Sequence, residues 1–108
     1  MTREHADFIG IRVPRTTPAA KCAGALRKLL PLSISEIRRR IAEEEYLYLG
    51  SFTDLEEVDL ALSLCKALAC AGIEADCFEH TEYFDRDRPF SREDLESWSR
   101  TCHDIEAE

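Results

Sequence analysis

The chain has 108 residues, a formal net charge of -8 and a charged fraction of 33%. This length suits one domain with one hydrophobic core, so we expect a single domain over residues 1–108. No apolar run approaches the roughly 20 residues that a membrane span needs, and the polar N-terminus lacks the apolar stretch of a signal peptide. We therefore expect a cytoplasmic protein that does not contact a membrane.

The charge is distributed unevenly along the chain. Residues 79–108 hold ten acids and four arginines, whereas residues 1–78 hold twelve acids and ten bases. An acidic C-terminal third repels nucleic-acid backbones and attracts basic partners. Basic residues do cluster in the first 40 positions, but neighbouring acids balance them. The composition therefore favours a protein partner over a nucleic acid.

The N-terminal part of the chain predicts a strand followed by a helix. Apolar residues alternate with other residues over positions 8–13, which is the period of a half-buried strand. Thr17 followed by Pro18 predicts a helix start, with threonine as the cap and proline at the first position. Pro31 then ends that helix, because proline cannot continue it.

A second helix and a second strand follow. Ser33 and Glu36 have the spacing of a capping box, and isoleucines after them recur on one helical face. Residues 46–52 then alternate as a strand, with leucines on one side and tyrosines on the other.

The next segment predicts a long helix and a third strand. Thr53 and Glu56 form another capping box, and an apolar stripe runs from there to Gly72, which is a typical C-terminal cap. Residues 73–78 alternate as the third strand. Residues 79–88 are charged and predict a loop.

A fourth helix is expected after residues 89–91. Leu95, Trp98, Cys102 and Ile105 recur at helical spacing and form its apolar stripe. We expect this helix to fold back over the sheet, because the stripe needs a surface on which to pack.

These elements predict an α+β fold with two layers in the order β-α-α-β-α-β, in which three helices cover one face of a three-stranded sheet and a C-terminal helix is added. The alternation assigns to the covered face Ile9, Ile11, Val13, Leu47, Leu49, Ile73, Ala75 and Cys77. The other face, which we call the open face, would present Phe8, Arg12, Tyr46, Tyr48, Glu74, Asp76, Phe78 and, at the strand end, His80. If the C-terminal helix does not cover it, this face is a binding surface with aromatic anchors and an acidic rim.

The joints between the elements are similar to those of a known family. Residues 25–38 read Ala-Leu-Arg-Lys-Leu-Leu-Pro-Leu-Ser-Ile-Ser-Glu-Ile-Arg, and residues 71–75 read Ala-Gly-Ile-Glu-Ala. Both segments resemble the C-terminal domain of the bacterial ribosomal stalk protein. The resemblance covers residues 8–78 and implies a core with all helices on one sheet face, to which residues 79–108 add an acidic loop and a helix.

The sequence gives little sign of chemistry. The five cysteines, without a signal peptide, are typical of buried thiols in a reducing compartment. A zinc site from Cys65, Cys70, Cys77 and His80 is conceivable, but its spacing matches no common ligand pattern. His80 beside carboxylates could act as a base only in a pocket. We expect no enzyme activity, no catalytic residues, no metal and no cofactor.

These observations favour a small acidic protein-binding domain, and specifically an immunity protein that binds and neutralises a cationic bacterial toxin. Acids would attract the basic partner and aromatic side chains would anchor it. The expected contacts are Tyr46, Tyr48, Asp54, Glu56, Glu57, Asp59, Tyr83, Asp85, Asp87 and Trp98. The alternative, which the resemblance implies, is an adaptor that binds translation factors or ribosomes through the helix face around Arg27, Lys28, Ser35, Arg38 and Arg39.

Overall fold

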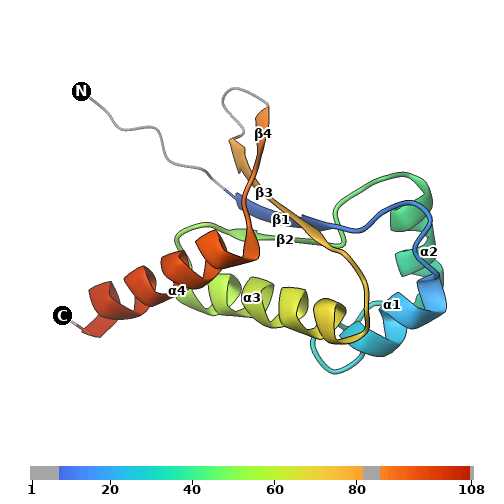
Figure 1. Ribbon diagram of the computed structural model, residues 1–108, viewed down its shortest axis with the longest axis horizontal. Coiled ribbons are helices and arrows are strands. Elements are labelled where there is room, and N and C mark those ends of the chain that lie inside the picture. Colours follow the sequence, from blue (N-terminus) through green and yellow to red (C-terminus); the bar gives the residue numbers. More distant parts are fainter. Residues whose placement is uncertain (1–7, 82–85, 108) are drawn as a thin grey trace.

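The computed structural model describes residues 8–81 and 86–107, which form a sheet with helices on one side of it (Figure 1). In chain order the elements are β1 (Phe8–Arg12), α1 (Ala19–Leu26), α2 (Ile34–Ala42), β2 (Tyr48–Ser51), α3 (Leu55–Cys70), β3 (Asp76–Thr81), β4 (Arg86–Pro89) and α4 (Arg92–Ala107). The α+β class, the β-α-α-β-α-β succession and the added C-terminal helix are confirmed.

The sheet is antiparallel, with the strand order β2-β1-β3-β4. β1 is thus an inner strand, and its register decides which residues share a face. Ile11 lies opposite Tyr48 on one side and Cys77 on the other. Residues directly opposite each other in antiparallel strands point to the same face. These three side chains therefore belong to the covered face.

The core fills the space between the covered face and α3. Ile9 of β1 is fully buried, and so are Val58, Ala61 and Leu68 of α3. Their spacing on α3 puts all three on one side of the helix. Burying each large side chain contributes about 1.5–3 kcal/mol, so this interface is the main source of stability and fixes α3 beneath the sheet.

The helix ends agree with the sequence patterns in part. The Ser33 hydroxyl accepts a hydrogen bond from the Glu36 N–H at 3.1 Å, and Gly72 ends α3 with a φ of 76°, as expected. Thr53 is not the cap of α3. Asp54 is the cap instead, and its carboxylate accepts from the N–H of Glu57 at 3.2 Å.

The first helix is also shorter than expected. It begins one residue later, with Pro18 rather than Thr17 at the cap, and no side chain caps it. It ends at Leu26 and continues only as a turn, since the N–H groups of Leu29 and Leu30 both donate to the Leu26 carbonyl. The helix therefore stops before Pro31 is reached.

The strand expected over residues 46–52 spans only Tyr48–Ser51, and its start contains an irregularity that reverses part of the expected alternation. Tyr48 is the register partner of Ile11. The N–H of the preceding residue, Leu47, also pairs with Ile11, because it donates to the Ile11 carbonyl at 2.8 Å. Two residues of one strand facing one residue of the next is the pattern of a β-bulge. Leu47 and Tyr48 consequently both point toward the helices, and Leu49 points away from them with 47% of its surface exposed. The assignment of Leu49 to the covered face and Tyr48 to the open face was wrong.

The expectation of a loop over residues 79–88 was also wrong. β3 runs on to Thr81, and β4 pairs with it from Phe78↔Pro89 to Thr81↔Arg86. The three-stranded sheet thereby gains a fourth strand at its edge. An edge strand has one paired side and tolerates charges and proline, so its sequence lacks the apolar alternation by which strands are recognised.

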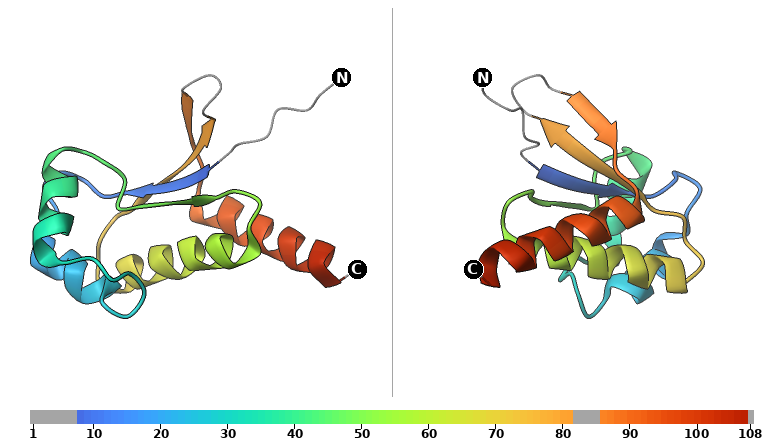
Figure 2. Two further views of the ribbon diagram at one scale, coloured as in Figure 1. Left: turned by 180° about the vertical axis from the view of Figure 1, so that it is seen from behind. Right: turned by 60° about the vertical axis from the view of Figure 1, so that its left-hand side comes forward.

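α4 does not fold over the open face. It lies beside α3 on the same side of the sheet, as the views in Figures 1 and 2 agree. Leu95 of α4 is fully buried. The Trp98 ring stacks on Phe52 with centroids 4.6 Å apart, and its indole N–H donates to the Phe52 carbonyl at 2.7 Å. Leu95, Trp98 and Cys102 of the apolar stripe are thus packed at the α3–α4 side of the molecule, whereas Ile105 at the far end of α4 is exposed.

We predict that Leu95→Ala lowers the free energy of unfolding by about 2–5 kcal/mol, because it removes a fully buried side chain and leaves a cavity. Ile105→Ala is the matched control on the same helix. Ile105 is 62% exposed, so its loss should change stability by no more than about 0.5 kcal/mol. Urea denaturation of both variants measures the difference. Equal effects would contradict the docking of α4 through Leu95.

Candidate functional site

The open face carries a cluster of aromatic side chains around one arginine. We call Phe8, Arg12, Tyr46, Phe78 and His80 the open-face cluster. Its rings pair at centroid distances of 6.3 Å for Phe8 and His80 and 6.2 Å for Tyr46 and Phe78. The Arg12 guanidinium carbon lies 5.1 Å from the Tyr46 centroid and 4.5 Å from the Phe78 centroid. Each such cation–π contact contributes roughly 0.5–2 kcal/mol.

Gly10 makes this arrangement possible. It lies opposite Leu49 and Phe78 in the register, at the centre of the open face. A Cβ atom built on Gly10 would collide with the Tyr46 ring. The ring therefore lies directly over the glycine backbone, within reach of both Phe78 and Arg12. A glycine inside a strand marks such a close approach.

Leu49 extends the open-face cluster toward the edge of the sheet. It is the residue of β2 that lies opposite Gly10, and it is among the few exposed large hydrophobic side chains of the described residues. None of the described helices lies on this side of the sheet (Figure 1). The open face is thus a surface of aromatic and aliphatic side chains with the Arg12 cation at the end of β1, where Asp76 lies opposite it.

Tyr48 belongs to the opposite side of the sheet. Its hydroxyl donates to the carbonyl of Glu57 at 3.0 Å, so the ring ties β2 to the first turn of α3. Burial, together with the negative charges of Glu57 and Asp54, raises the pKa of Tyr48 to about 12. The position is structural, and the expectation that Tyr48 anchors a partner on the open face was wrong.

Acidic residues surround the start of α3. Some of them are exposed to solvent, and others contact neighbouring parts of the protein. Asp54 is an exposed cap, Glu56 is exposed and Glu57 is half-buried. Asp59 accepts a hydrogen bond from the Ser99 hydroxyl at 2.6 Å through one oxygen, and its other oxygen lies 2.9 Å from Nε2 of His103. Asp59 therefore joins α3 to α4.

The Ser99, Asp59 and His103 group contains the residue types of a catalytic triad in the wrong order. In a triad the imidazole lies between the hydroxyl and the carboxylate, and it takes the hydroxyl proton. Here the carboxylate lies between the other two. The group can orient side chains and hold the helices together, but it cannot activate the serine. The group was not predicted from the sequence, because Asp59 lies 40 positions before Ser99 and 44 before His103.

The remaining expected contacts are divided. Trp98 is half-buried against Phe52 and belongs to the α3–α4 interface. Asp87 lies in β4 opposite His80. Tyr83 and Asp85 lie outside the described residues. Of the ten expected contacts, Tyr46 thus lies in the open-face cluster, whereas Asp54 and Glu56 are exposed at the start of α3.

The conceivable zinc ligands are not brought together. Cys65 and Cys77 face each other beneath the sheet, His80 lies on the open face and Cys70 is exposed at the end of α3. Among the residues that the structure describes, no group of three or more histidine, cysteine, aspartate or glutamate side chains could hold a metal ion.

The basic face of α2 is largely neutralised. Arg39 forms ion pairs with Glu36, Glu43 and Glu45 at 2.7, 2.6 and 3.1 Å. Arg40 pairs with Glu36 at 2.9 Å and also donates to the Leu47 carbonyl at 3.0 Å. Arg40 thereby connects α2 to the start of β2, so these arginines have a structural role.

Comparison with protein-family models, curated proteins and solved structures found no match to this chain. The resemblance to the ribosomal stalk domain therefore stays a prediction. The described helices include none long and apolar enough to cross a membrane.

We predict that Gly10→Ala destabilises the protein by about 1–3 kcal/mol, since the added methyl group must displace the Tyr46 ring. The matched control is Gly24→Ala in α1, where nothing lies within 4 Å of a new Cβ and where alanine should stabilise by about 0.4–1 kcal/mol. Chemical denaturation gives the energies, and NMR of the Tyr46 ring reports its position. An undisturbed Tyr46 ring in Gly10→Ala would refute the contact.

We predict that α2 loses stability in acid below roughly pH 4, because hydrogen bonds from Arg39 and Arg40 lower the pKa of Glu36 to about 2. With the pKa depressed in the folded state, the stabilisation is present above the ordinary glutamate value of about 4.3 and is lost as the pH falls toward 2. NMR titration of the Glu36 carboxyl carbon, with amide exchange of α2, measures this. Glu36→Gln should remove the pH dependence, whereas a Glu36 pKa near 4.3 would exclude the interaction.

Proposed function

We propose that the chain is a small acidic protein-binding domain that contacts a basic protein partner through its open sheet face. The observation that carries this proposal is the exposure of Leu49 beside the open-face cluster, on a face that no described helix covers. Contiguous exposed apolar surface is typical of contact sites, and aromatic side chains with arginine are the residues that most often anchor interfaces.

The charge of the helical layer supports a basic partner. Asp54, α3 and α4 together contain nine acids and three bases, and α3 and α4 lie side by side. Asp54 and Glu56 lie where α3 follows β2, the strand that carries Leu49. Such a surface accelerates the approach of a basic protein and disfavours acidic ones.

In its most specific form, the proposal is that the protein is an immunity protein that neutralises a cationic bacterial toxin. The support is a small acidic chain with an apolar face and no recognisable catalytic group among the residues described. The acids of α3 and α4 lie in the layer beneath the sheet, so they would attract a basic partner over a distance and would not pair directly with groups bound on the open face. We propose a binding role without catalysis, cofactor, nucleic acid or membrane.

A second candidate is the adaptor role, and a groove of about 500 Å³ favours it. The groove lies between α1 and the turn that leads into α2, and it is lined by Ala23, Gly24, Arg27 and Ile34 among others. Ile34 is 48% exposed. Against this candidate, Arg39 is occupied by three glutamates and is thus poorly available for a partner.

Leu49→Arg and Ile34→Arg separate the two candidates, since both replace an equally exposed apolar side chain with a cation. The experiment is calorimetric titration of the purified chain with the product of the adjacent gene, at low and high salt. Leu49→Arg should weaken binding about tenfold or more, and Ile34→Arg should leave it unchanged. Binding should also weaken with salt, because the acids are exposed.

The opposite pattern would favour the groove and the adaptor role, in which case ribosomes or elongation factors replace the adjacent gene product as the titrant. Absence of salt-sensitive binding to the adjacent gene product would refute the immunity proposal. Thermal denaturation of both variants confirms that any lost binding is not lost folding, because a surface substitution should change stability little.

A further inference from the structure

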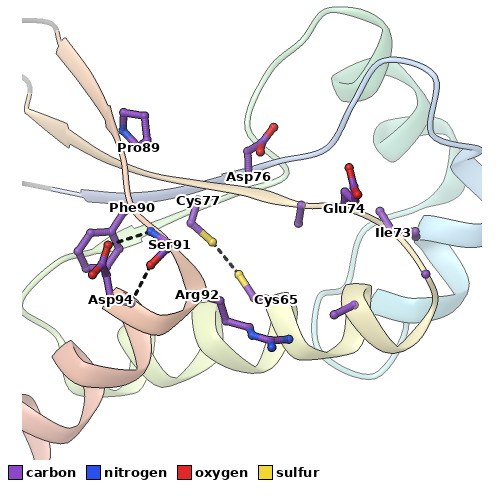
Figure 3. A pocket seen from close by; sticks show the side chains of 13 residues that line it. Cys65, Ile73, Glu74, Asp76, Cys77, Pro89, Phe90, Ser91, Arg92 and Asp94 are labelled. Atoms are coloured by element: carbon purple, nitrogen blue, oxygen red, sulfur yellow. Dashed lines mark hydrogen bonds between the residues drawn. The ribbon is translucent and has the colours of Figure 1, made fainter.

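Two cysteines meet beneath the sheet. Cys65 on α3 and Cys77 on β3 point toward each other, and their Sγ atoms lie 2.8 Å apart (Figure 3). Both side chains are buried, with 5% and 8% of their surface exposed. A disulfide bond is about 2.05 Å long, so the two sulfurs need to approach by less than roughly 1 Å. The surrounding fold holds them close to bonding geometry.

A surface pocket gives small molecules access to this pair. The pocket has a volume of about 810 Å³, and both Cys65 and Cys77 line it together with Phe90, Ser91 and Arg92. The Arg92 side chain extends from the first turn of α4 toward the sulfurs (Figure 3). Arg92 is the cation among the residues that line the pocket.

The two thiols have different environments. The hydrogen bond from Cys65 lowers the pKa of Cys77, because a Cys77 thiolate accepts a hydrogen bond from the Cys65 S–H, while burial and the charge of Asp76 act in the opposite direction. The same hydrogen bond and burial raise the pKa of Cys65. Cys77 is therefore the better nucleophile, and Cys65 is placed to react second.

The three other cysteines, Cys22, Cys70 and Cys102, do not line the pocket. Burial alone raises the pKa of Cys22 to about 11, which disfavours its thiolate. Cys70 is exposed and Cys102 is buried, and both lie outside the pocket lining. The reactive arrangement thus belongs to one pair.

We propose that Cys65 and Cys77 form a reversible disulfide when the protein meets a small hydroperoxide. Disulfides of proteins in reducing compartments are usually transient and redox-sensing, and a reactive thiolate beside a second cysteine is the usual form of such a sensor. The pocket admits the oxidant, and the second thiol resolves the product.

The reaction balances in two steps. The Cys77 thiolate attacks one peroxide oxygen, so that an S–O bond forms, the O–O bond breaks and the leaving alkoxide or hydroxide takes a proton. The sulfur of Cys77 is thereby oxidised to a sulfenic acid. Cys65 then loses its proton and attacks that sulfur, the S–S bond forms and water leaves. A thiol reductant restores both cysteines by exchange.

The bond would join α3 directly to β3. The loop that it closes runs from residue 65 to residue 77, around Gly72 and the end of the helix. Closing a loop of this size removes entropy from the unfolded chain, so the oxidised protein should melt roughly 10 °C higher than the reduced one.

The test treats the full chain, purified in reduced form, with hydrogen peroxide and measures the intact mass. The mass of the protein should fall by two hydrogen atoms, peptide mapping should locate the bond between Cys65 and Cys77, dithiothreitol should reverse it and the melting temperature should rise. Cys70→Ser is the matched control and should behave as the original chain does. Cys65→Ser should instead accumulate a sulfenic acid at Cys77, which a dimedone adduct reveals.

Oxidation that stops at a sulfenic acid in the unaltered chain, or a bond that involves Cys70 or a second molecule, would overturn the proposal. So would a dimedone adduct at another cysteine in Cys65→Ser. Peptide mapping of the unaltered chain tests the proposed Cys65–Cys77 bond even if a cysteine variant does not fold. Arg92→Gln gives a further check. The Arg92 charge acts to lower the pKa of Cys65, so its loss should slow the attack of Cys65 on the sulfenic acid, and with it disulfide formation, severalfold without moving the bond to other residues.

Discussion

Packing of α3 against one face of the sheet is the constraint on which the other features depend. β1 is an inner strand, and its residues Ile9 and Ile11 are almost fully buried against the helix. A strand alternates its side chains, so fixing these two residues inward forces Phe8, Gly10 and Arg12 to the other side. The open face is thus a direct consequence of the core. α4 adds to the same layer, because α3 offers it a flank on which Leu95 can be buried.

The side chains of the open-face cluster hold one another in a defined arrangement. Gly10 leaves room for the Tyr46 ring, and Arg12 lies over Tyr46 and Phe78. Aromatic pairs contribute about 0.5–1.5 kcal/mol beyond the area that they bury, so the rings hold one another in place. Interfaces gain affinity when anchors need no ordering on binding. A cluster of this kind therefore suits recognition better than scattered aromatic side chains would.

Local patterns in the sequence predicted many of the parts of the fold that local interactions determine, although the caps expected at Thr17 and Thr53 were misplaced by one residue. The β1 alternation, the Ser33 cap and the Gly72 helix end depend on neighbours within a few residues, and all three were found. The bulge at Leu47 and Tyr48 depends on the distant Ile11 carbonyl, so periodicity alone put Leu49 and Tyr48 on the wrong faces. The apolar stripe of α4 showed that the helix packs, but it could not show which surface receives Leu95. Edge strand β4 carries charges instead of an apolar pattern, and it was missed for that reason.

The same limit applies to the candidate sites. Tyr46 and Phe78 were assigned to the open face because alternation is a local property, whereas the meeting of Cys65 with Cys77 requires the helix and the strand to be docked. These two features share β3, in which Cys77 points to the core and Phe78 to the open face. A covalent bond at Cys77 would restrict the backbone that also positions Phe78, because adjacent residues of a strand move together. Oxidation beneath the sheet would therefore stiffen the surface above it, and a partner that binds there would meet a more rigid face.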